Sequence, residues 1–389
     1  MQKRLCFIMC LALSGWLLGS VIMDLGTGIL VETSGNCSVE VDSLIETGTG
    51  YFKGEITSGA QTGMTEFAGM SLSAGLTGSI TRHTGAAYSE GNGEGTNFLR
   101  YYEVSNTGGS DLTADMQVQF VSSGNDERNG LSGPYFLHRY ASSKWTGHGC
   151  GVTVTPDTAD GVVIPSGSSD WLLSTGNRLA VKAFLHGPYS TTGDTMTAYL
   201  EPSAYIPLTS PYTDDARTVS AIPSDVIDWV FLQVRSSATN DTVASRSAFI
   251  DTEGNIVDDD GTTLYTYIAA FPASYYITVL HRNHCSIMTS ASHALAFGSS
   301  TQYNFTDNSS KYYGGTLAAN ELETDVWGMI TGDANMNGEV QADDKENYWR
   351  VEVGLPGYKA SDFNLNGEVQ ADDKESYWRI NVGKGSQVP

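Results

Sequence analysis

The chain has 389 residues, of which 44 are Asp or Glu and 21 are Lys or Arg, so its formal net charge at pH 7 is -23. This excess of negative charge argues against nucleic acid and anionic membrane surfaces as partners, because both would repel the protein. The length is sufficient for two or three domains with substantial cores. We expect a soluble protein that works in a cation-rich medium.

The first 23 residues have the pattern of a secretory signal peptide. A basic start, Gln2 to Arg4, precedes an apolar run from Leu5 to Met23. An uncleaved anchor is the alternative, because the run is about long enough to span a bilayer, but Gly15, Gly19 and Ser20 interrupt it. We predict a signal peptide over residues 1–23, secretion to the extracellular space or cell surface, and no membrane span after cleavage.

Cysteine usage gives no disulfide framework. Two of the five cysteines lie in the signal region, which leaves Cys37, Cys150 and Cys285. Their number is odd and their spacing is wide. One pair could form in an oxidising compartment, and the sequence leaves its identity open.

Residues 24–177 are rich in Gly, Ser and Thr and contain short runs of alternating polar and apolar residues. Alternation is typical of half-buried strands, and no long helical periodicity is present. We predict strands over residues 98–104, 116–120 and 151–155. This part of the chain is therefore expected to form a first antiparallel β-sandwich-like module.

Residues 178–325 show stronger strand patterns and predict a second β-sandwich module, by analogy a transthyretin-like one. Asp251 to Asn255 is a predicted hairpin turn, and Asp258 to Gly261 is the next. The three carboxylates of that second turn could hold a cation, but acidic hairpin tips are common, and we favour a plain turn. The predicted strands cover residues 179–186, 196–200, 228–235, 243–251 and 275–281.

The last sixty residues contain one stretch written twice. Asn337 to Glu346 is identical to Asn366 to Glu375, and both copies continue into the same aromatic segment, at Tyr348 to Arg350 and Tyr377 to Arg379. Each copy has the ligand pattern of a twelve-residue calcium loop: side-chain oxygens at positions 1, 3 and 5, Gly at 6, a backbone carbonyl at 7 and a carboxylate at 12. The predicted ligands are Asp333, Asn335, Asn337, Glu339 and Asp344 in the first loop, and Asp362, Asn364, Asn366, Glu368 and Asp373 in the second.

A pair of Asn-Gly turns on a solvated acidic tail is the alternative, but two matches in register favour two bound Ca²⁺ ions. Positions 3 and 5 are neutral in both loops, so we expect a dissociation constant of about 10⁻⁴ M. Short helices are expected over residues 343–352 and 372–381, ended by Gly354 and Gly383. Val340 and Val369, at position 8, are expected to pair the two loops as a short strand. The near identity of the copies predicts a pseudo-twofold tail that can present the same face from either loop.

This tail, residues 326–389, resembles a dockerin module. The resemblance implies two calcium ions, a small α-helical domain built on paired EF-hand-type loops, and docking to a cohesin-like partner. Position 5 is Asn where dockerins usually have Asp, and the segment after each loop is aromatic rather than Leu-rich. The closing residues, together with Asp228 to Arg235 and Tyr275 to His284, are similar to C-terminal regions of large secreted adhesin-like surface proteins of Bacteroidetes-type bacteria.

Reactive side chains outside the tail are few. His281, His284 and Cys285 could bind zinc with His148 or His293 as a fourth ligand. Along a continuous strand, however, His284 would point away from the other two, and we favour a strand end whose histidines form hydrogen bonds. Three tryptophans could form a sugar platform or belong to the core: Trp145, Trp171 and Trp229.

No nucleophile, metalloprotease or phosphate-loop motif is present, and we predict no catalytic residues. Paired carboxylates for glycosidic chemistry leave no readable spacing in the sequence. The first functional hypothesis is therefore a secreted, non-enzymatic surface or matrix protein that docks to a protein partner through its calcium-loaded tail. The second is a polysaccharide-binding or polysaccharide-degrading component delivered by the same tail.

Overall fold

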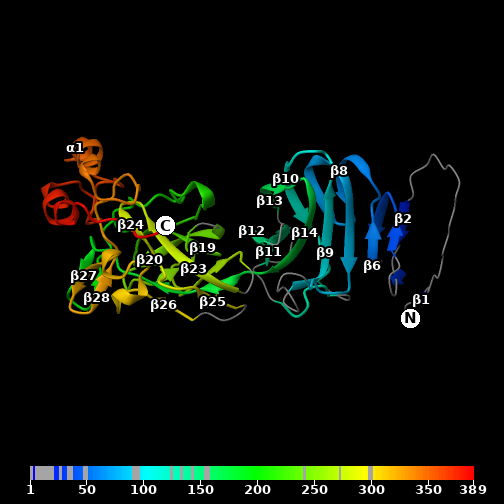
Figure 1. Ribbon diagram of the computed structural model, residues 1–389, viewed down its shortest axis with the longest axis horizontal. Coiled ribbons are helices and arrows are strands. Elements are labelled where there is room, and N and C mark those ends of the chain that lie inside the picture. Colours follow the sequence, from blue (N-terminus) through cyan, green and yellow to red (C-terminus); the bar gives the residue numbers. More distant parts are fainter. Residues whose placement is uncertain are drawn as a thin grey trace. The chain divides into compact units, whose positions relative to one another are not determined.

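The computed structural model describes residues 3–4, 22–25, 29–32, 38–46, 51–89, 97–122, 126–131, 135–141, 144–152, 158–239, 242–270, 273–296 and 301–389 (Figure 1). Most of the predicted signal peptide and Cys37 lie outside these residues. The chain is mainly β, as the sequence predicts. It divides into two compact units: residues 1–176 with 269–271, and residues 177–268 with 272–389. None of the described helices is both long and apolar enough to cross a membrane.

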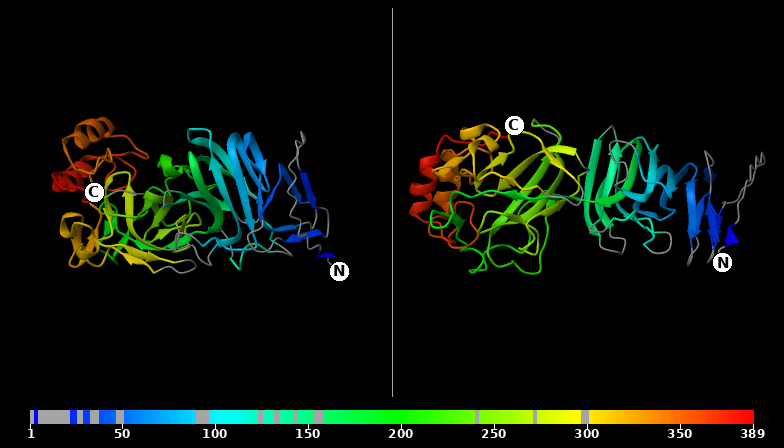
Figure 2. Two further views of the ribbon diagram at one scale, coloured as in Figure 1. Left: turned by 45° about the vertical axis from the view of Figure 1, so that its right-hand side comes forward. Right: turned by 90° about the horizontal axis from the view of Figure 1, so that it is seen from below.

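The first unit contains one large, mostly antiparallel sheet that curls (Figure 2). Its central strands follow the order β6-β8-β9-β14-β11-β12, and β10 pairs with both β8 and β13. The strands of this unit are β1 (Lys3–Arg4), β2 (Ile22–Leu25), β3 (Ile29–Glu32), β4 (Ser38–Glu40), β5 (Ser43–Glu46), β6 (Tyr51–Thr57), β7 (Gln61–Phe67), β8 (Met70–Thr84), β9 (Asn97–Asn106), β10 (Leu112–Val118), β11 (Tyr135–Ala141), β12 (Lys144–Val152), β13 (Thr158–Ile164) and β14 (Gly167–Thr175).

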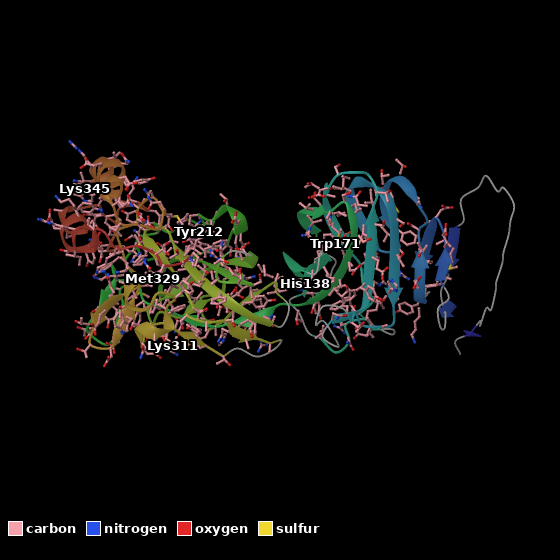
Figure 3. The ribbon with its side chains drawn as sticks, in the orientation of Figure 1. His138, Trp171, Tyr212, Lys311, Met329 and Lys345 are labelled. Atoms are coloured by element: carbon pink, nitrogen blue, oxygen red, sulfur yellow. The ribbon has the colours of Figure 1, made fainter. Side chains whose placement is uncertain are left out.

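Alternation along these strands builds the core of the first unit. In β8 nearly every second residue is buried, from Met70 to Thr84. Phe98, Tyr102 and Trp171 are fully buried in the same cluster. Trp171 is labelled in Figure 3. Trp171 is therefore a core residue and not part of a sugar platform. The strands predicted at 98–104 and 116–120 are present, although the second ends at residue 118. The side chains of Trp145, His148 and Cys150 in β12 lie outside the described part, as do residues 153–157.

The second unit is built on a sheet with the strand order β21-β20-β19-β23-β24, in which all neighbours are antiparallel and β25 also pairs with β23. The three long strands match the predicted strands at 228–235, 243–251 and 275–281. Their bounds are β19 (Val226–Arg235), β20 (Thr242–Asp251), β21 (Ile256–Val257), β23 (Ala273–His281), β24 (His284–Met288) and β25 (His293–Leu295).

Shorter pairs of strands surround this sheet. The strand predicted over 179–186 is broken into β15 and β16, and the one predicted over 196–200 retains only Met196 in β18. The pairs are β15 (Asn177–Leu179) with β22 (Thr266–Ile268), β16 (Val181–Lys182) with β26 (Tyr303–Asn304), β17 (Tyr189–Ser190) with β18 (Thr195–Met196), and β27 (Asn320–Glu323) with β28 (Val326–Gly328). Three single turns of 3-10 helix lie at η1 (Thr213–Asp215), η2 (Ser309–Lys311) and η3 (Gly315–Leu317).

The repeated tail begins as part of this second unit. Met329 (Figure 3) forms a bridge with Leu185, and Thr331 forms one with His284. Two helical segments follow, one after each loop, as predicted. The first comprises η4 (Asp344–Trp349), a π-helical turn, and α1 (Arg350–Glu352); the second comprises η5 (Asp373–Trp378), also π-helical, and η6 (Arg379–Asn381). Gly354 and Gly383 follow these helices with φ of 85° each, the left-handed conformation that ends a helix.

Candidate metal centres

The first aspartate of each repeated loop holds the loop's backbone in a tight turn. Asp333 accepts hydrogen bonds from the backbone N–H of Asn337 at 3.0 Å and of Gly338 at 2.9 Å. Asp362 accepts from Asn366 at 3.1 Å and from Gly367 at 2.9 Å. The glycine at position 6 has φ of 89° in the first loop and 90° in the second. This left-handed conformation is easily adopted by glycine and is strained for residues that have a side chain. Both copies therefore have the backbone bend that the calcium-loop pattern requires.

The aspartate at position 12 closes each loop from its other end. One oxygen of Asp344 accepts from Ala334 N at 2.9 Å, and the other accepts from Gln341 N at 2.7 Å. Asp373 makes the equivalent bonds with Phe363 N at 2.8 Å and Gln370 N at 2.7 Å. All four aspartates at positions 1 and 12 are buried, with at most 1% exposure. The sequence thus places two inward carboxylates in each loop.

The neutral positions supply oxygens to the same interior. Asn335 Oδ1 accepts from Asn337 N at 3.0 Å, and Asn337 Oδ1 accepts from Glu339 N at 2.9 Å. On either side of Glu339, Gly338 O accepts from Ser386 N and Val340 O accepts from Gly383 N. Because carbonyls alternate along a paired extended backbone, the Glu339 carbonyl points the opposite way, away from residues 383–386. The second loop repeats this pattern at Glu368, whose two neighbours bond to Gly357 and Gly354.

Asp343 and Asp372, at position 11, are candidate positioning residues that the sequence pattern did not identify. Asp343 Oδ2 accepts from Asn335 Nδ2 at 2.7 Å, and Asp372 Oδ2 accepts from Asn364 Nδ2 at 2.9 Å. Each bond fixes the amide so that its oxygen faces the loop, the positioning role that outer carboxylates have around metal ligands. The other oxygen of both aspartates is buried without a hydrogen-bond partner. The sequence does contain a signal for these residues, because a second aspartate precedes the position-12 aspartate in both copies.

Burial perturbs the carboxyl groups of both loops. It raises the pKa of Asp333 to about 6 and that of Asp362 to about 7, and the partner carboxylate at position 12 adds to each shift. Burial also raises the pKa of Asp373 to about 6 and raises that of Asp344. A paired, buried carboxylate is unfavourable in its charged form unless a cation lies nearby. The interior of each loop therefore disfavours uncompensated negative charge, although Arg282 partly offsets it at Asp362.

The donor set fits a hard cation with oxygen ligands. Among the described residues, no group of three or more His, Cys, Asp or Glu side chains could hold a metal ion. Each loop instead combines two carboxylates with two amide oxygens and one backbone carbonyl. Oxygen-only sets of this kind suit Ca²⁺ and do not suit zinc. The residues that would hold Ca²⁺ are the ten predicted ones.

The two repeats stabilise each other through reciprocal hydrogen bonds, in which each repeat contacts the loop of the other. Trp349 Nε1 donates to Gln370 O in the second loop at 2.8 Å, and Trp378 Nε1 donates to Gln341 O in the first at 2.9 Å. The predicted pairing of the two loops through Val340 and Val369 is wrong. Each buried valine pairs instead with the backbone that follows the other repeat's helix, Val340 with residues 383–384 and Val369 with residues 354–355. The two loops cannot also pair with each other through these valines, because the backbone N–H and C=O groups of both valines already form these hydrogen bonds.

The symmetry of the tail is broken where it meets the sheet of the second unit. Asn283 Nδ2 donates to Asp362 O at 2.7 Å, and Thr331 Oγ1 donates to Phe363 O at 3.1 Å. At position 4, Leu365 is fully buried, whereas its counterpart Met336 is 45% exposed. Position 4 is therefore not equivalent in the two loops. The exposed apolar side chains at the two helix ends are similar in both repeats, so the same face presented from either repeat stays a prediction.

The histidine cluster is a hydrogen-bonded hairpin end. A two-residue turn separates β23 from β24, so His281 and His284 face each other with Nδ1 atoms 2.9 Å apart. Their predicted placement on opposite faces is wrong because it assumed a continuous strand. His281 Nε2 lies 3.3 Å from Asp228 Oδ2, and Cys285 is buried as a free thiol beside Ile330 and Val340. Among described residues these side chains form no metal cluster.

The acidic hairpin tip and Trp229 also have structural roles. Asp258 forms an ion pair with Arg246, and Asp259 forms one with Arg217 at 3.0 Å. The turn predicted there is present, with Gly261 N bonded to Asp258 O at 2.9 Å. Trp229 is fully buried and stacks near Phe249. Arginine neutralises the tip, so a cation is not needed there.

No family matches the chain, and neither a curated protein nor a solved structure matches it.

Proposed function

We propose that the two repeated loops bind two Ca²⁺ ions and that the protein is a secreted, non-enzymatic surface or matrix component. The observation that carries the proposal is the duplicated arrangement of Asp, Asn, Asn and Asp oxygens around each loop interior, with buried carboxylates whose pKa values are raised. A divalent cation would stabilise the charged form of these carboxylates. Both β-rich units are proposed to be sandwich-like modules that carry the calcium tail.

Calcium has a structural role in this proposal. The start of the second loop bonds directly to Asn283 and Thr331, so ordering that loop also orders its contact with the sheet. Metal binding that orders a small domain contributes to its folding free energy. We therefore expect the ions to fix the tail against the sheet within the second unit.

Docking to a cohesin-like or other surface protein is the second part of the proposal. It is supported by large apolar side chains left exposed at and just beyond the end of each helical segment. Val351 is 68% exposed and its repeat counterpart Ile380 is 57% exposed, while Val353 and Val382 are 43% and 49% exposed. Where such side chains form one contiguous patch, they mark a protein-interaction site. A polysaccharide-binding role is the alternative, and a specific pocket described below favours it.

Calorimetric titration of Ca²⁺ into the full secreted chain, after chelator treatment, tests the calcium proposal. We expect two ions per chain, one ion for Asp333→Ala or Asp362→Ala, and none for the double variant. Glu339→Gln is the matched control, because position 7 offers its backbone carbonyl and not its exposed side chain. Absence of binding at millimolar Ca²⁺, or equal loss in the control, would overturn the proposal.

Docking is tested with a recombinant cohesin domain. Binding that requires Ca²⁺ and is lost in Val351→Glu, but not in Thr324→Glu on the exposed turn between β27 and β28, would support a dockerin-like role. If the chain binds both Ca²⁺ ions but does not bind the cohesin domain, the calcium proposal stands and the cohesin-docking proposal is overturned.

A further inference from the structure

A polar pocket of about 530 Å³ lies between the segment around β17 and β18 and the second calcium loop. Its size falls within the range of about 300–1,000 Å³ that small-molecule sites usually occupy. One wall comes from residues 187–191 with Thr197 and Tyr199. The other comes from Asn364, Asn366, Asp372 and Tyr377. All of these residues belong to the second unit, so the pocket is a feature of one compact body.

The chemistry of the lining selects the class of ligand. The exposed lining is mainly polar, from hydroxyl, amide, carboxylate and backbone groups, and the rings of Tyr189, Tyr199 and Tyr377 with Pro188 contribute the smaller apolar part. No Lys or Arg lines the pocket, and Asp372 contributes a negative charge, which argues against an anionic ligand. A purely apolar ligand would leave the amides and hydroxyls without partners. The lining therefore suits a neutral ligand with many hydroxyl groups and apolar C–H faces.

Several polar groups of the pocket remain available to such a ligand. Tyr199 is 48% exposed, and within the described part of the chain neither its hydroxyl nor that of Tyr377 forms a hydrogen bond. The amide N–H groups of Asn366 also have no acceptor there, whereas Asn337 in the first loop donates to Asp343 at 3.5 Å. Tyr189 is different, because its hydroxyl already bonds to Asp194 and Glu323. Its ring, packed beside Phe184, is left to contact a ligand face.

We propose that this pocket binds a neutral saccharide, with tyrosine rings packing against sugar C–H faces and with Asn366, Tyr199 and Tyr377 bonding to sugar hydroxyls. The first loop has the same residue types at Asn335, Asn337, Asp343 and Tyr348, but the opposing wall of residues 187–199 lines only the second loop. The first loop is therefore an internal control, because it repeats the Asn, Asp and Tyr residues of the pocket but lacks the opposing wall. The proposal relies on an ordered second loop and in that respect rests on the proposed calcium binding.

The test is saturation-transfer NMR and calorimetry on the full secreted chain in saturating Ca²⁺, with neutral hexasaccharides of glucose, mannose, galactose and xylose as probes. We expect at least one probe to bind with a dissociation constant of about 1 mM or tighter. Tyr199→Ala should weaken that binding at least tenfold and Tyr377→Phe several-fold. Tyr348→Phe, at the equivalent position of the first repeat, should leave it unchanged.

Calcium titration of the same samples separates the two proposals. Two bound ions without binding of any probe would overturn the saccharide pocket and leave the calcium sites in place. Saccharide binding by a chain that binds no Ca²⁺ in the titration would support the pocket and overturn the proposed calcium sites. Equal loss of binding in Tyr348→Phe and Tyr377→Phe, or binding of peptides in place of all the saccharides, would also overturn the pocket.

Discussion

The hydroxyl of Tyr358 donates a hydrogen bond to Asp228 Oδ1 across 2.6 Å, which joins the segment between the two loops to the central strand β19. Asp228 is fully buried, and its other oxygen accepts from Arg282 Nε at 2.7 Å. Arg282 in turn lies over the Tyr358 ring at 4.1 Å and bonds to Lys359 O. This cluster, Asp228, Arg282 and Tyr358, connects the tail to the sheet independently of the loops.

Replacing the buried carboxylate should destabilise the second unit. Burial raises the pKa of Asp228, but the Arg282 charge and the hydrogen bonds with His281 and Tyr358 together outweigh it, so this pKa lies at about 2. Asp228→Asn removes the charge and leaves a buried guanidinium without compensation, a change that typically costs about 3–5 kcal/mol. Urea unfolding of the second unit measures it. Asp214→Asn, at an exposed position, is the control, and similar midpoints for the two variants would contradict the role of the cluster.

His186 predicts a specific loss of stability in mild acid. Burial and the nearby Lys384 lower its pKa to about 4, and its Nδ1 accepts from Asn320 Nδ2 at 2.9 Å. The unfolded chain takes up a proton near pH 6.5. The stability that neutral His186 provides is therefore complete above about pH 6.5 and is lost as the pH falls toward 4.

Comparison of wild type with His186→Gln measures this effect, because glutamine retains an acceptor for Asn320 but does not titrate. Between about pH 7.5 and pH 5 the wild type should lose roughly 2 kcal/mol of unfolding free energy more than the variant. Parallel pH profiles would show that His186 is not the responsible group.

Restoring an acidic residue at position 5 should tighten calcium binding. Asn337→Asp adds a carboxylate where the loop now has an amide, and affinity in such loops rises with ligand charge. We expect about tenfold tighter binding at the first loop, equivalent to about 1.4 kcal/mol. Titration in an Asp362→Ala background isolates that loop. An unchanged dissociation constant would indicate that the position-5 side chain does not reach the ion.

Removing the last six residues should affect the first loop and not the second. Val340 N donates to Lys384 O at 2.9 Å, and Ser386 N donates to Gly338 O. A chain ending at Gly383 loses both bonds, whereas residues 354–355 still pair with Val369. We expect one Ca²⁺ ion per chain, held by the second loop. A chain lacking only Pro389 is the control, and two ions bound with unchanged affinity by the shorter chain would contradict this assignment.

Local patterns were predictable from sequence. The loop geometry depends on residues within twelve positions of each other, so the spacing of Asp333, Gly338 and Asp344 was enough to place the turns and the closing carboxylate. The same holds for β19, β20 and β23, whose apolar runs are long. By contrast, the hairpin turn after His281 depends on only two residues, Arg282 and Asn283, and Asn283 alone favours a turn without fixing its position.

The contacts that connect the tail to the sheet were not predictable. Asp228 and Tyr358 are 130 positions apart, and neither residue type in isolation indicates a partner. The exchange of backbone between repeats was missed for a related reason. Two identical copies give no sign of whether each valine pairs with its twin or with the far end of the other copy, because both solutions satisfy the same local pattern.

The exchange between repeats has a consequence for how such a tail can change in length. Each copy supplies the backbone segment that completes its neighbour's loop, with residues 354–355 serving the second and residues 383–384 serving the first. A single repeat would therefore lack the backbone segment that pairs with its loop. In a tail of three repeats, the third loop would find no unpaired segment. Gain or loss of material in this tail is expected to occur in whole pairs, so the pair and not the single repeat is the unit that can be inherited, duplicated or transferred to another protein.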